Sequence, residues 1–334
     1  MSEAAARAFP NIALVKYWGK RDTSLILPVA GSLSLTLDTY ATTTTVRLDP
    51  DAAADSFTLN GVPGAAIPTQ RVTRFLDLVR ERAGSTARAR VDSLSEIPTD
   101  AGLASSAAGF AALAVAAGAA YGLELDARAL SRLARRGSGS AARSIIAGLA
   151  VWHAGDDAQS FAEPVRGPEF TMIILTLDRS AKRVSSRDAM VRTAHTSPFY
   201  DGWISSTAQT LDAALAACRA DDFTALGLLT ELHALRMHAL IQSADPPIRY
   251  LKPASIAAFD RVEELRAAGL ECYATADAGP NVVVIARPED AVQVATELAV
   301  LGETRVVGPG PGATLLTDEA GLTDEVGLTD GAAG

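Results

Sequence analysis

Two lysines stand four residues apart in the apolar segment NIALVKYWGK, residues 11–20. The chain has only four lysines among its 30 basic residues, so the choice of lysine at Lys16 and Lys20 is informative. An ammonium among apolar neighbours is costly to desolvate unless an anion pairs with it, and the broader guanidinium of arginine does not replace such a compact charge. A strand whose lysines extend to solvent would explain one of them. Two lysines around Tyr17, Trp18 and Gly19 instead favour an anion site.

The segment IPTDAGLASSAAG, residues 97–109, predicts a glycine- and serine-rich loop that runs into a helix. Gly102 permits a tight turn, and Ser105 and Ser106 stand where the helix should begin. The free N–H groups and the dipole at a helix start attract phosphate, and the hydroxyls can add donors or hold a hydrated Mg²⁺. Serine is also a common helix cap, which is the alternative. The small residues from Ala104 onward favour the phosphate loop, because they let a ligand approach the backbone closely.

A second loop, GSGSAAR at residues 137–143, has a similar character. Ser138 and Ser140 offer hydroxyls, and Arg143 lies about one turn inside an expected helix. A guanidinium there can take a carboxylate in a bidentate fork. A flexible linker between two helices is the alternative, and the additional arginines at positions 135 and 136 weigh against it.

Asp277 lies in the turn TADAGPN, residues 275–281. Aspartate in a Gly-Pro turn is most often structural. If Asp277 meets Lys16, however, an ionised carboxylate beside an ammonium becomes available as a base or an orienting group. Ser186 and Arg187 follow an expected strand and the basic pair at residues 182 and 183, and a basic cluster in such a place is usually a solvated sheet edge.

The elements that must position these residues alternate between strand and helix patterns, which predicts an α+β protein. Strands are expected at residues 31–37, 41–48, 87–95, 151–153, 170–177, 272–277, 281–286 and 304–307. Helices are expected at residues 69–83, about 108–121, 126–136, 138–147, 207–240, 253–268 and 289–301. Of these, 207–240 reads as almost continuous helix, with Asp222 and Gly227 as weak interruptions. The alternation in 31–37 indicates an antiparallel sheet with one covered face, and the βαββαβ order of the second half is typical of a ferredoxin-like domain.

The length of 334 residues suggests two domains. We place an N-terminal domain at residues 1–180 and a C-terminal domain at residues 181–315. Residues 316–334 form an acidic six-residue near-repeat (LTDEAG, LTDEVG, LTDG), for which a disordered tail is the expectation.

Composition excludes several classes of function. The net charge of −9 argues against sequence-independent nucleic-acid binding, which needs a basic face. Two cysteines are too few for a disulfide framework or a thiolate zinc site, and the four histidines lack metal-site spacing. The N-terminal residues lack the apolar core of a signal peptide, and the apolar stretch 107–121 is shorter than the roughly 20 residues that span a bilayer. We therefore expect a soluble protein of a reducing compartment that binds a small anionic molecule.

Six motifs, in order along the chain, resemble those of the diphosphomevalonate decarboxylase family, and the similarity covers roughly residues 9–315. This family belongs to the superfamily of galactokinase, homoserine kinase, mevalonate kinase and phosphomevalonate kinase. The motifs occupy residues 11–22, 102–106 (GLASS), 135–143 (RRGSGSAAR), 184–190 (VSSRDAM), 237–239 (MHA) and 276–281 (ADAGPN). The resemblance implies a two-domain α+β fold. Its N-terminal domain would resemble domain 2 of ribosomal protein S5, its C-terminal domain would be ferredoxin-like, and its active site would lie in the cleft between them.

The resemblance also implies a reaction: ATP- and Mg²⁺-dependent decarboxylation of 5-diphosphomevalonate to isopentenyl diphosphate, through a 3-phosphorylated intermediate. The implied catalytic residues are Asp277, Lys16, Asn11 and Arg143. The implied substrate-binding residues are Tyr17, Lys20, Ser138, Ser140, Arg143, Ser186 and Arg187. The implied ATP-binding residues are Gly102, Leu103, Ala104, Ser105 and Ser106, with Ser105 also a ligand of Mg²⁺. A cytoplasmic homodimer without membrane or nucleic-acid partners completes the expectation.

Three alternatives stay open at this point. A kinase that stops after phosphorylating its alcohol is disfavoured by Ala104 in the loop together with Lys16, Asp277 and Arg143. A decarboxylase of the 5-monophosphate is disfavoured by the intact Tyr-Trp-Gly-Lys pattern. A non-catalytic binding protein of the same fold would be expected to have lost Asp277 or Lys16, and both are present.

Overall fold

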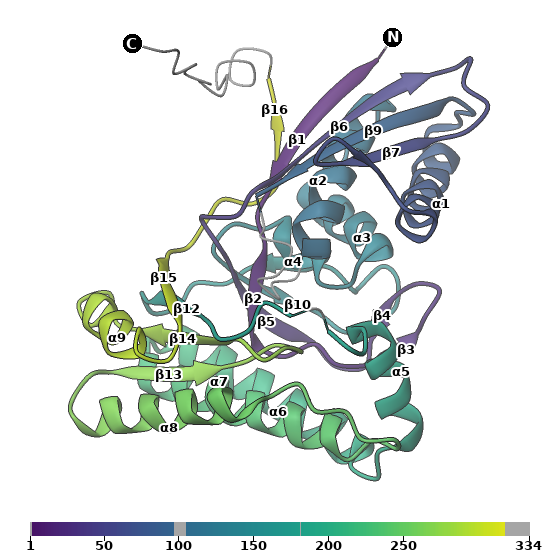
Figure 1. The fold of residues 1–334 in the computed structure, drawn as a ribbon. Helices are drawn as coiled ribbons and strands as arrows, with labels where there is room; N and C mark the ends of the chain where they lie inside the picture. The colour runs from purple at the N-terminus through teal and green to yellow at the C-terminus, as the bar shows by residue number, and fades with distance from the viewer. Residues whose placement is uncertain (1, 97–104, 181, 318–334) are drawn as a thin grey trace, which may run out of the picture.

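A computed structural model describes residues 2–96, 105–180 and 182–317 of the chain (Figure 1). One sheet has the strand order β16-β1-β6-β9-β7-β8 and is antiparallel except where β7 runs parallel to β9. Its strands are β1 (Glu3–Ala8), β6 (Thr42–Asp49), β7 (Ser56–Leu59), β8 (Val62–Pro63), β9 (Arg88–Ser95) and β16 (Thr314–Leu316). Helices α1 (Ala66–Ala83), α2 (Ser105–Ala120) and α3 (Ala127–Gly137) share a core with this sheet. The small side chains of α2 let it lie within that core, where most of its residues are buried.

A second antiparallel sheet carries much of the predicted site. It consists of β11 (Ala162–Pro164), β10 (Leu149–Trp152), β5 (Ser32–Thr36) and β2 (Asn11–Val15), in that order. A small pair, β3 (Lys20–Asp22) and β4 (Leu27–Pro28), follows β2 in the chain. The expectation that strand 31–37 has only one covered face was wrong, because every residue of β5 is buried. Its apolar side chains enter one core, and its alternate hydroxyls face a buried arginine that is described below.

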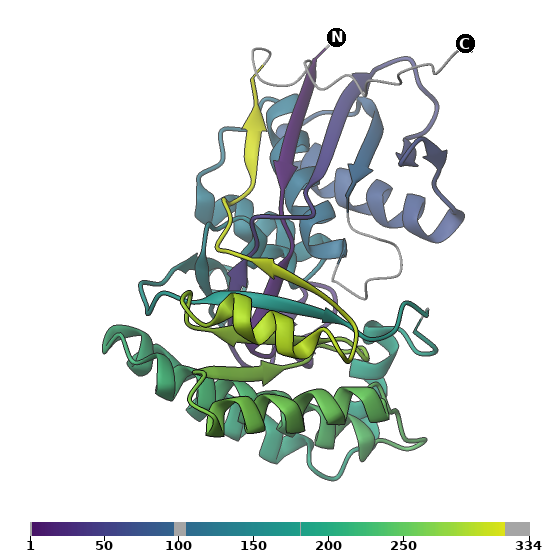
Figure 2. The same cartoon turned by 60° about the vertical axis from the view of Figure 1, so that its left-hand side comes forward.

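The third sheet has the order β13-β14-β12-β15, with all pairs antiparallel. Its strands are β12 (Thr171–Thr176), β13 (Cys272–Thr275), β14 (Val282–Ala286) and β15 (Glu303–Val307). Helices α8 (Pro253–Ala267) and α9 (Ala291–Leu298) cover one face of this sheet (Figure 2). The opposite face packs against residues of β2 and β5 and against two further helices. The βαββαβ connectivity is the predicted ferredoxin-like order.

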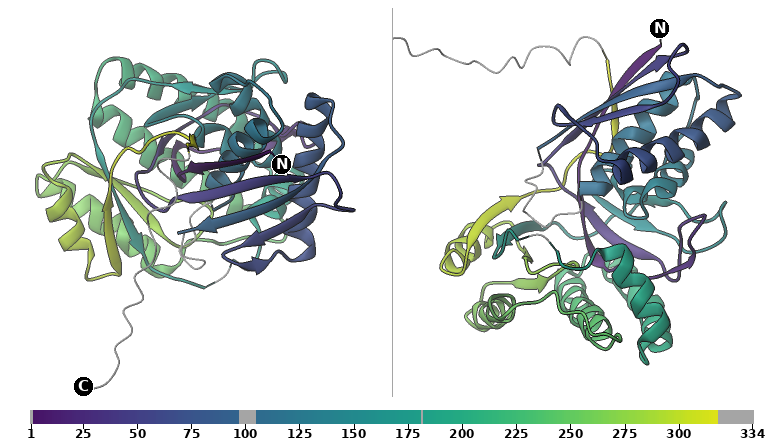
Figure 3. Two further views of the ribbon diagram at one scale, coloured as in Figure 1. Left: turned by 90° about the horizontal axis from the view of Figure 1, so that it is seen from above. Right: turned by 45° about the vertical axis from the view of Figure 1, so that its right-hand side comes forward.

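Three helices connect β12 to α8. They are α5 (Ser186–Thr196), α6 (Tyr200–Arg219) and α7 (Phe223–Gln242), and α6, α7 and α8 lie together at the end of the molecule away from β1 (Figure 3). The prediction of an almost continuous helix at 207–240 was wrong at one point. Asp221 has a φ of 56°, and Asp222 caps α7 by accepting a hydrogen bond from the Ala225 N–H, so the chain reverses there. Gly227 lies inside α7 and does not interrupt it. Glycine is needed at this position because a side chain would collide with the ring of Tyr273.

The helix expected at residues 138–147 is also much shorter than predicted. Only α4 (Ala141–Ser144), a single turn, forms there, between the glycines at positions 139 and 148. None of the helices in the described ranges is long and apolar enough to cross a membrane. The predicted tail, apart from residues 316 and 317, lies outside the described residues, and the domain division near residue 180 stays a prediction.

Candidate active site

Lys16 and Asp277, which are 261 residues apart in sequence, form an ion pair. Lys16 follows the end of β2, and Asp277 follows β13, so the pair joins the second sheet to the third. The Nζ–Oδ1 distance is 2.7 Å, and Nζ also donates to the Ala13 carbonyl at 2.6 Å. The Lys16 side chain is 1% exposed and that of Asp277 is 36% exposed. The interpretation of Lys16 as a solvent-directed strand lysine is therefore wrong, while the carboxylate keeps a face open to a ligand.

Electrostatics favour an ionised Asp277. Burial raises the pKa of this carboxyl, but the Lys16 ammonium outweighs burial, with help from Lys182 and Arg143, so the pKa lies below its usual value. Burial lowers the pKa of Lys16, and the Asp277 carboxylate opposes that shift. The result is a carboxylate that is ready to accept a proton or a hydrogen bond from a hydroxyl.

Arg143, in α4, is buried in a network of polar side chains. Its Nε donates to Ser34 Oγ at 2.9 Å, and its Nη1 donates to Ser32 Oγ at 2.6 Å. Its Nη2 donates to Asn11 Oδ1 at 3.0 Å. A guanidinium has five N–H groups, so among the described residues one N–H on each terminal nitrogen stays available for a carboxylate. Burial lowers the pKa of Arg143 to about 10, which leaves it charged at neutral pH.

Asn11 acts within the same network. Its Nδ2 donates to the Ser140 carbonyl at 3.0 Å and to Ser144 Oγ at 2.7 Å, while its Oδ1 accepts from Arg143. Asn11 is 2% exposed. Because these bonds already use its amide, the geometry indicates that it positions Arg143 and the loop at Ser140.

A chain of hydroxyls connects the two predicted loops. Ser106 Oγ lies 3.2 Å from Ser138 Oγ, which lies 3.3 Å from Ser140 Oγ. Ser105 and Ser106 are the first residues of α2, as predicted. The other predicted phosphate-loop residues, Gly102, Leu103 and Ala104, lie outside the described residues.

The segment after Lys16 supplies a phenol and a second lysine. The Tyr17 ring packs edge-on against Trp152, with ring centroids 4.8 Å apart, while its buried hydroxyl has no partner among the described residues. The hydroxyl lies 2.8 Å from where a Cβ on Gly139 would stand, so glycine is needed there for Tyr17 to reach the Ser138–Ser140 loop. The ring of Tyr17 is thus part of the core, while its hydroxyl is available to a ligand. Burial raises its pKa, which keeps the hydroxyl protonated as a donor.

Lys20, Arg71 and Arg187 form a group of neighbouring cations, which we call the cation cluster. Burial lowers the pKa of Lys20 to about 8, and the charges of Arg187 and Arg71 add to this effect. Within the described ranges, none of the three forms an ion pair, although Arg71 Nη2 donates to the Gly137 carbonyl at 3.2 Å. Arg187 is exposed and lies in the first turn of α5, next to the predicted residue Ser186. Ser185 caps this helix by accepting from the Asp188 N–H, which the sequence interpretation missed.

Sequence reasoning also missed Lys182, Arg71 and His233. Lys182 is close enough to Asp277 to lower the pKa of that carboxyl. His233 accepts the backbone N–H of Lys16. The rarity of lysine could have drawn attention to Lys182. Arg71 and His233 lie inside amphipathic helix patterns, and only the fold brings them to the site.

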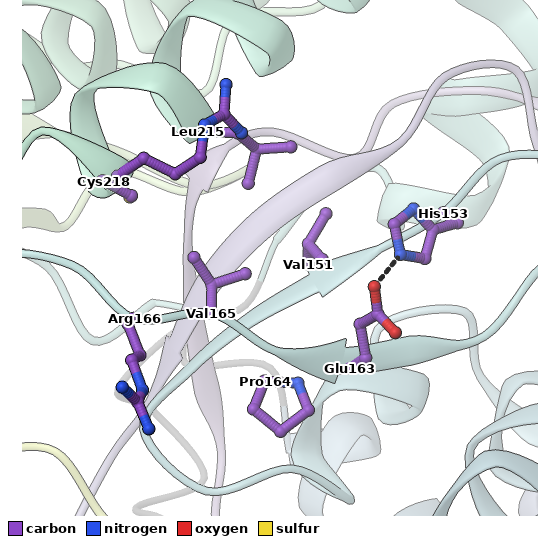
Figure 4. A pocket seen from close by; sticks show the side chains of 9 residues that line it. Val151, His153, Glu163, Pro164, Val165, Arg166, Leu215 and Cys218 are labelled. Carbon is purple, nitrogen blue, oxygen red and sulfur yellow. Dashed lines mark hydrogen bonds and ion pairs between the residues drawn. The ribbon is translucent and has the colours of Figure 1, made fainter.

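A separate concavity lies between β10, β11 and α6, with a volume of about 450 Å³. In Figure 4, His153 and Glu163 form a hydrogen bond at its rim, with Nε2 and Oε1 2.8 Å apart. None of the predicted site residues lines it. The candidate active site is therefore defined by its charged groups rather than by this concavity.

Comparison with known proteins gives the same family over both halves of the chain. Residues 8–162 match the diphosphomevalonate decarboxylase-like N-terminal domain, and residues 172–304 match the mevalonate 5-diphosphate decarboxylase C-terminal domain. The diphosphomevalonate decarboxylase of Ganoderma lucidum is 36% identical over 326 residues, which are 89% of this chain and 81% of that protein. The human diphosphomevalonate decarboxylase is 36% identical over 299 residues, covering 82% of this chain and 74% of that protein.

Solved structures agree. A structure of MDDEF in complex with MVAPP, AMPPCP and magnesium superimposes with a TM-score of 0.90 at 44% identity, over 94% of this chain and 99% of that one. Mevalonate diphosphate decarboxylase from Staphylococcus aureus gives a TM-score of 0.91 at 38% identity, over 95% and 98%. Two matching domain models, curated relatives and whole-chain structural neighbours all lead to one conclusion. The chain belongs to the diphosphomevalonate decarboxylase family.

Proposed function

We propose that this protein catalyses the ATP-dependent decarboxylation of 5-diphosphomevalonate to isopentenyl diphosphate, with release of ADP, phosphate and CO₂. The observation that carries the proposal is the partly open, ionised Asp277, which Lys16 holds within the electrostatic reach of the buried Arg143. This arrangement offers a base for an alcohol and a guanidinium for a carboxylate on the same molecule. Diphosphomevalonate carries both groups, and its diphosphate is a second anionic group that a protein can bind.

The residues described fit a bound nucleotide. Ser105 and Ser106 begin a helix of 16 residues, where free N–H groups and the dipole favour phosphate. Among the described residues no group of three or more His, Cys, Asp or Glu side chains could hold a metal. Mg²⁺ would therefore be held largely by the nucleotide phosphates and by Ser105, which is how this ion usually accompanies ATP. It supplies charge neutralisation on the phosphates, and the related MDDEF complex holds magnesium together with AMPPCP and MVAPP.

In the first step, Asp277 accepts a proton or a hydrogen bond from the C3 hydroxyl of the substrate. The hydroxyl oxygen forms a bond to the γ-phosphorus of ATP, and the bond from that phosphorus to the leaving oxygen of ADP breaks. Such a transfer depends mainly on positioning and charge neutralisation. Lys16 fixes the carboxylate, and Lys182, which is exposed, adds a positive charge beside it.

In the second step, the C3–O bond breaks and the new phosphate leaves. The electron pair of the C1–C2 bond becomes the C2=C3 double bond, and C1 departs as CO₂. The two free N–H groups of Arg143 would orient the C1 carboxylate until it leaves. The chemistry needs no pyridoxal, thiamine or redox group, because ATP has already installed the leaving group.

The diphosphate end of the substrate would lie at the cation cluster, next to Tyr17, Ser138, Ser140 and Ser186. Lys20, Arg71 and Arg187 supply charge, and the free Tyr17 hydroxyl supplies a donor. A substrate that is anionic at both ends would thus use the cation cluster for its diphosphate and Arg143 for its carboxylate.

The test is a stoichiometry assay. The protein is incubated with ATP, Mg²⁺ and either mevalonate, its 5-phosphate or its 5-diphosphate, while ADP, phosphate and CO₂ are counted. We expect equal amounts of all three, with the diphosphate only. ADP without CO₂ would identify a kinase, CO₂ from the monophosphate would change the substrate, and nucleotide binding without turnover would indicate a non-catalytic relative.

The proposal extends to a cytoplasmic homodimer. Three leucines at helical spacing on α7, Leu228, Leu232 and Leu235, are 51%, 41% and 43% exposed, and this apolar stripe supports burial against a second copy. Cys218 and Cys272 are both buried free thiols, which suits a reducing compartment. Light scattering on the purified chain and on Leu232→Glu tests the dimer. The unaltered protein should have the mass of two chains, and Leu232→Glu that of one. A mass of one chain for the unaltered protein would refute the dimer.

A further inference from the structure

The backbone on both sides of Tyr17 is held by side chains from two helices of the other half of the molecule. The Lys16 N–H donates to His233 Nδ1, in α7, at 2.9 Å. The Trp203 Nε1, in α6, donates to the Trp18 carbonyl at 2.8 Å. The two side chains also contact one another, with ring centroids 4.6 Å apart. The segment that carries the catalytic lysine is thus fixed at two main-chain atoms.

His233 has a defined tautomer. Because Nδ1 accepts the Lys16 N–H, the ring proton must lie on Nε2, which is 3.2 Å from Thr207 Oγ1. The residue is fully buried. Burial, followed by the charges of Lys16 and Arg236, lowers the pKa of His233 to about 3, so the ring is neutral throughout the physiological range.

This contact lies where regular sheet pairing stops. Strand β2 ends at Val15, and its register with β5 already shifts between Ala13 and Val15. The backbone of Lys16 therefore depends on His233 rather than on β5. From this backbone position the Lys16 side chain turns back to the Ala13 carbonyl and reaches Asp277.

We propose that His233 is a positioning residue for the reaction, acting through the Lys16 backbone to hold the ammonium against Asp277. The inference rests on the proposed function, in which Asp277 is the base or orienting group. It also assigns α6 and α7 a part in catalysis, since Thr207 and Trp203 fix the ring of His233. A histidine that merely satisfies the core would stabilise the fold without affecting the protonation of Asp277.

The experiment compares three variants with the unaltered enzyme. His233→Asn places a carbonyl oxygen near the Nδ1 position, whereas His233→Gln places the same amide near Nε2, and His233→Leu removes the acceptor. We expect kcat to fall by about a hundredfold in the Leu and Gln variants, because small displacements of a reacting group cost about that much. His233→Asn should recover most of kcat. The KM for ATP should stay unchanged in all three.

The pH profile of kcat separates positioning from stability. Asp277 is faced by Lys16, Lys182, Arg143 and His238, and Lys16 is the group that His233 fixes. If the ammonium moves away, the pKa of Asp277 rises, so the acid limb of the profile should move to higher pH in the Leu and Gln variants and return in the Asn variant.

Equal kcat values and equal acid limbs in the Asn and Gln variants would overturn the inference. The comparison of these two variants tests the inference even if the Leu variant does not fold. Failure of the unaltered enzyme to release CO₂ would instead refute the proposed function. Circular dichroism melting curves establish that each variant is folded at the assay temperature.

Discussion

The candidate active site contains two cationic regions that differ in how their charges are paired. Lys16 is 1% exposed, is paired with Asp277 and is held by hydrogen bonds to both its ammonium and its backbone. In the cation cluster of Lys20, Arg71 and Arg187, by contrast, no member has a carboxylate partner among the described residues. A paired cation is neutralised and fixed, so it positions other groups. Unpaired cations that repel one another gain stability when an anion arrives, so they bind ligand.

The comparison predicts different kinetic signatures for the two regions. Changes at the paired site should lower kcat, whereas changes in the cation cluster should raise the KM of the diphosphate substrate. The predictions below proceed from the largest expected effect to the smallest.

Asp277→Asn should lower kcat by about 10³-fold, in the range typical of a lost general base, while binding of an ATP analogue stays close to normal. The amide cannot accept the proton, and the Lys16 ammonium loses its counter-charge. Single-turnover assays with calorimetric nucleotide titration measure the two quantities. Activity within tenfold of the unaltered enzyme would remove Asp277 from the mechanism.

Arg143→Lys should lower kcat/KM by about a hundredfold, with kcat falling and KM rising together, since the fork for the departing carboxylate is lost. It should also lower Tm, because Asn11, Ser32 and Ser34 lose buried bonds. Arg90→Lys, at a surface ion pair with Asp49, is the matched control and should leave both unchanged. Normal kinetics in Arg143→Lys would show that Arg143 is structural only.

Lys20→Met should raise the KM for diphosphomevalonate by about 10- to 100-fold, the loss expected for one hydrogen bond to a charged group, with kcat nearly preserved. Steady-state kinetics at saturating ATP provide the measurement. A fall in kcat without a change in KM would break the distinction between the two regions.

Lys20 also predicts a pH effect. Its pKa is lowered to about 8, so the ammonium is present below that pH and lost above it. The kcat/KM for the diphosphate, which reports the free enzyme, should therefore decline above about pH 8. In Lys20→Arg the decline should move beyond the measurable range, because arginine stays charged. An identical alkaline limb in both enzymes would exclude Lys20 as its source.

Much of this organisation could be predicted from the sequence. The order of strands and helices in the second half follows from hydrophobic periodicity, and the motif resemblance assigns Lys16 and Asp277 to one site. That the two side chains form an ion pair was only a condition in the sequence argument until the fold was known. What could not be predicted depends on tertiary contacts. The hydroxyls of Ser32 and Ser34 look like a solvated face until Arg143 is placed against them. His233 looks like an ordinary residue of an amphipathic helix until the backbone of Lys16 is brought to it.

Local conformation explains the remaining errors. The break between α6 and α7 depends on the positive φ of Asp221, which helix propensity does not reveal. The single turn of α4 is shorter than the pattern at 138–147 suggests, because the carbonyls of Ser144 and Ile146 accept hydrogen bonds from the Ala313 N–H and the Thr36 hydroxyl instead of from a further helical turn.

Strand β16 pairs with β1, so residues 314–316 complete the edge of a sheet that begins at residue 3. A ribosome makes β1 before, and β16 after, all the other strands of this sheet. Until residue 316 has emerged, the free edge of β1 presents unpaired N–H and C=O groups, which are a template for association with other chains. Completion of the first sheet therefore comes after its other strands have been made, and the outer edge of β1 stays open to association until then.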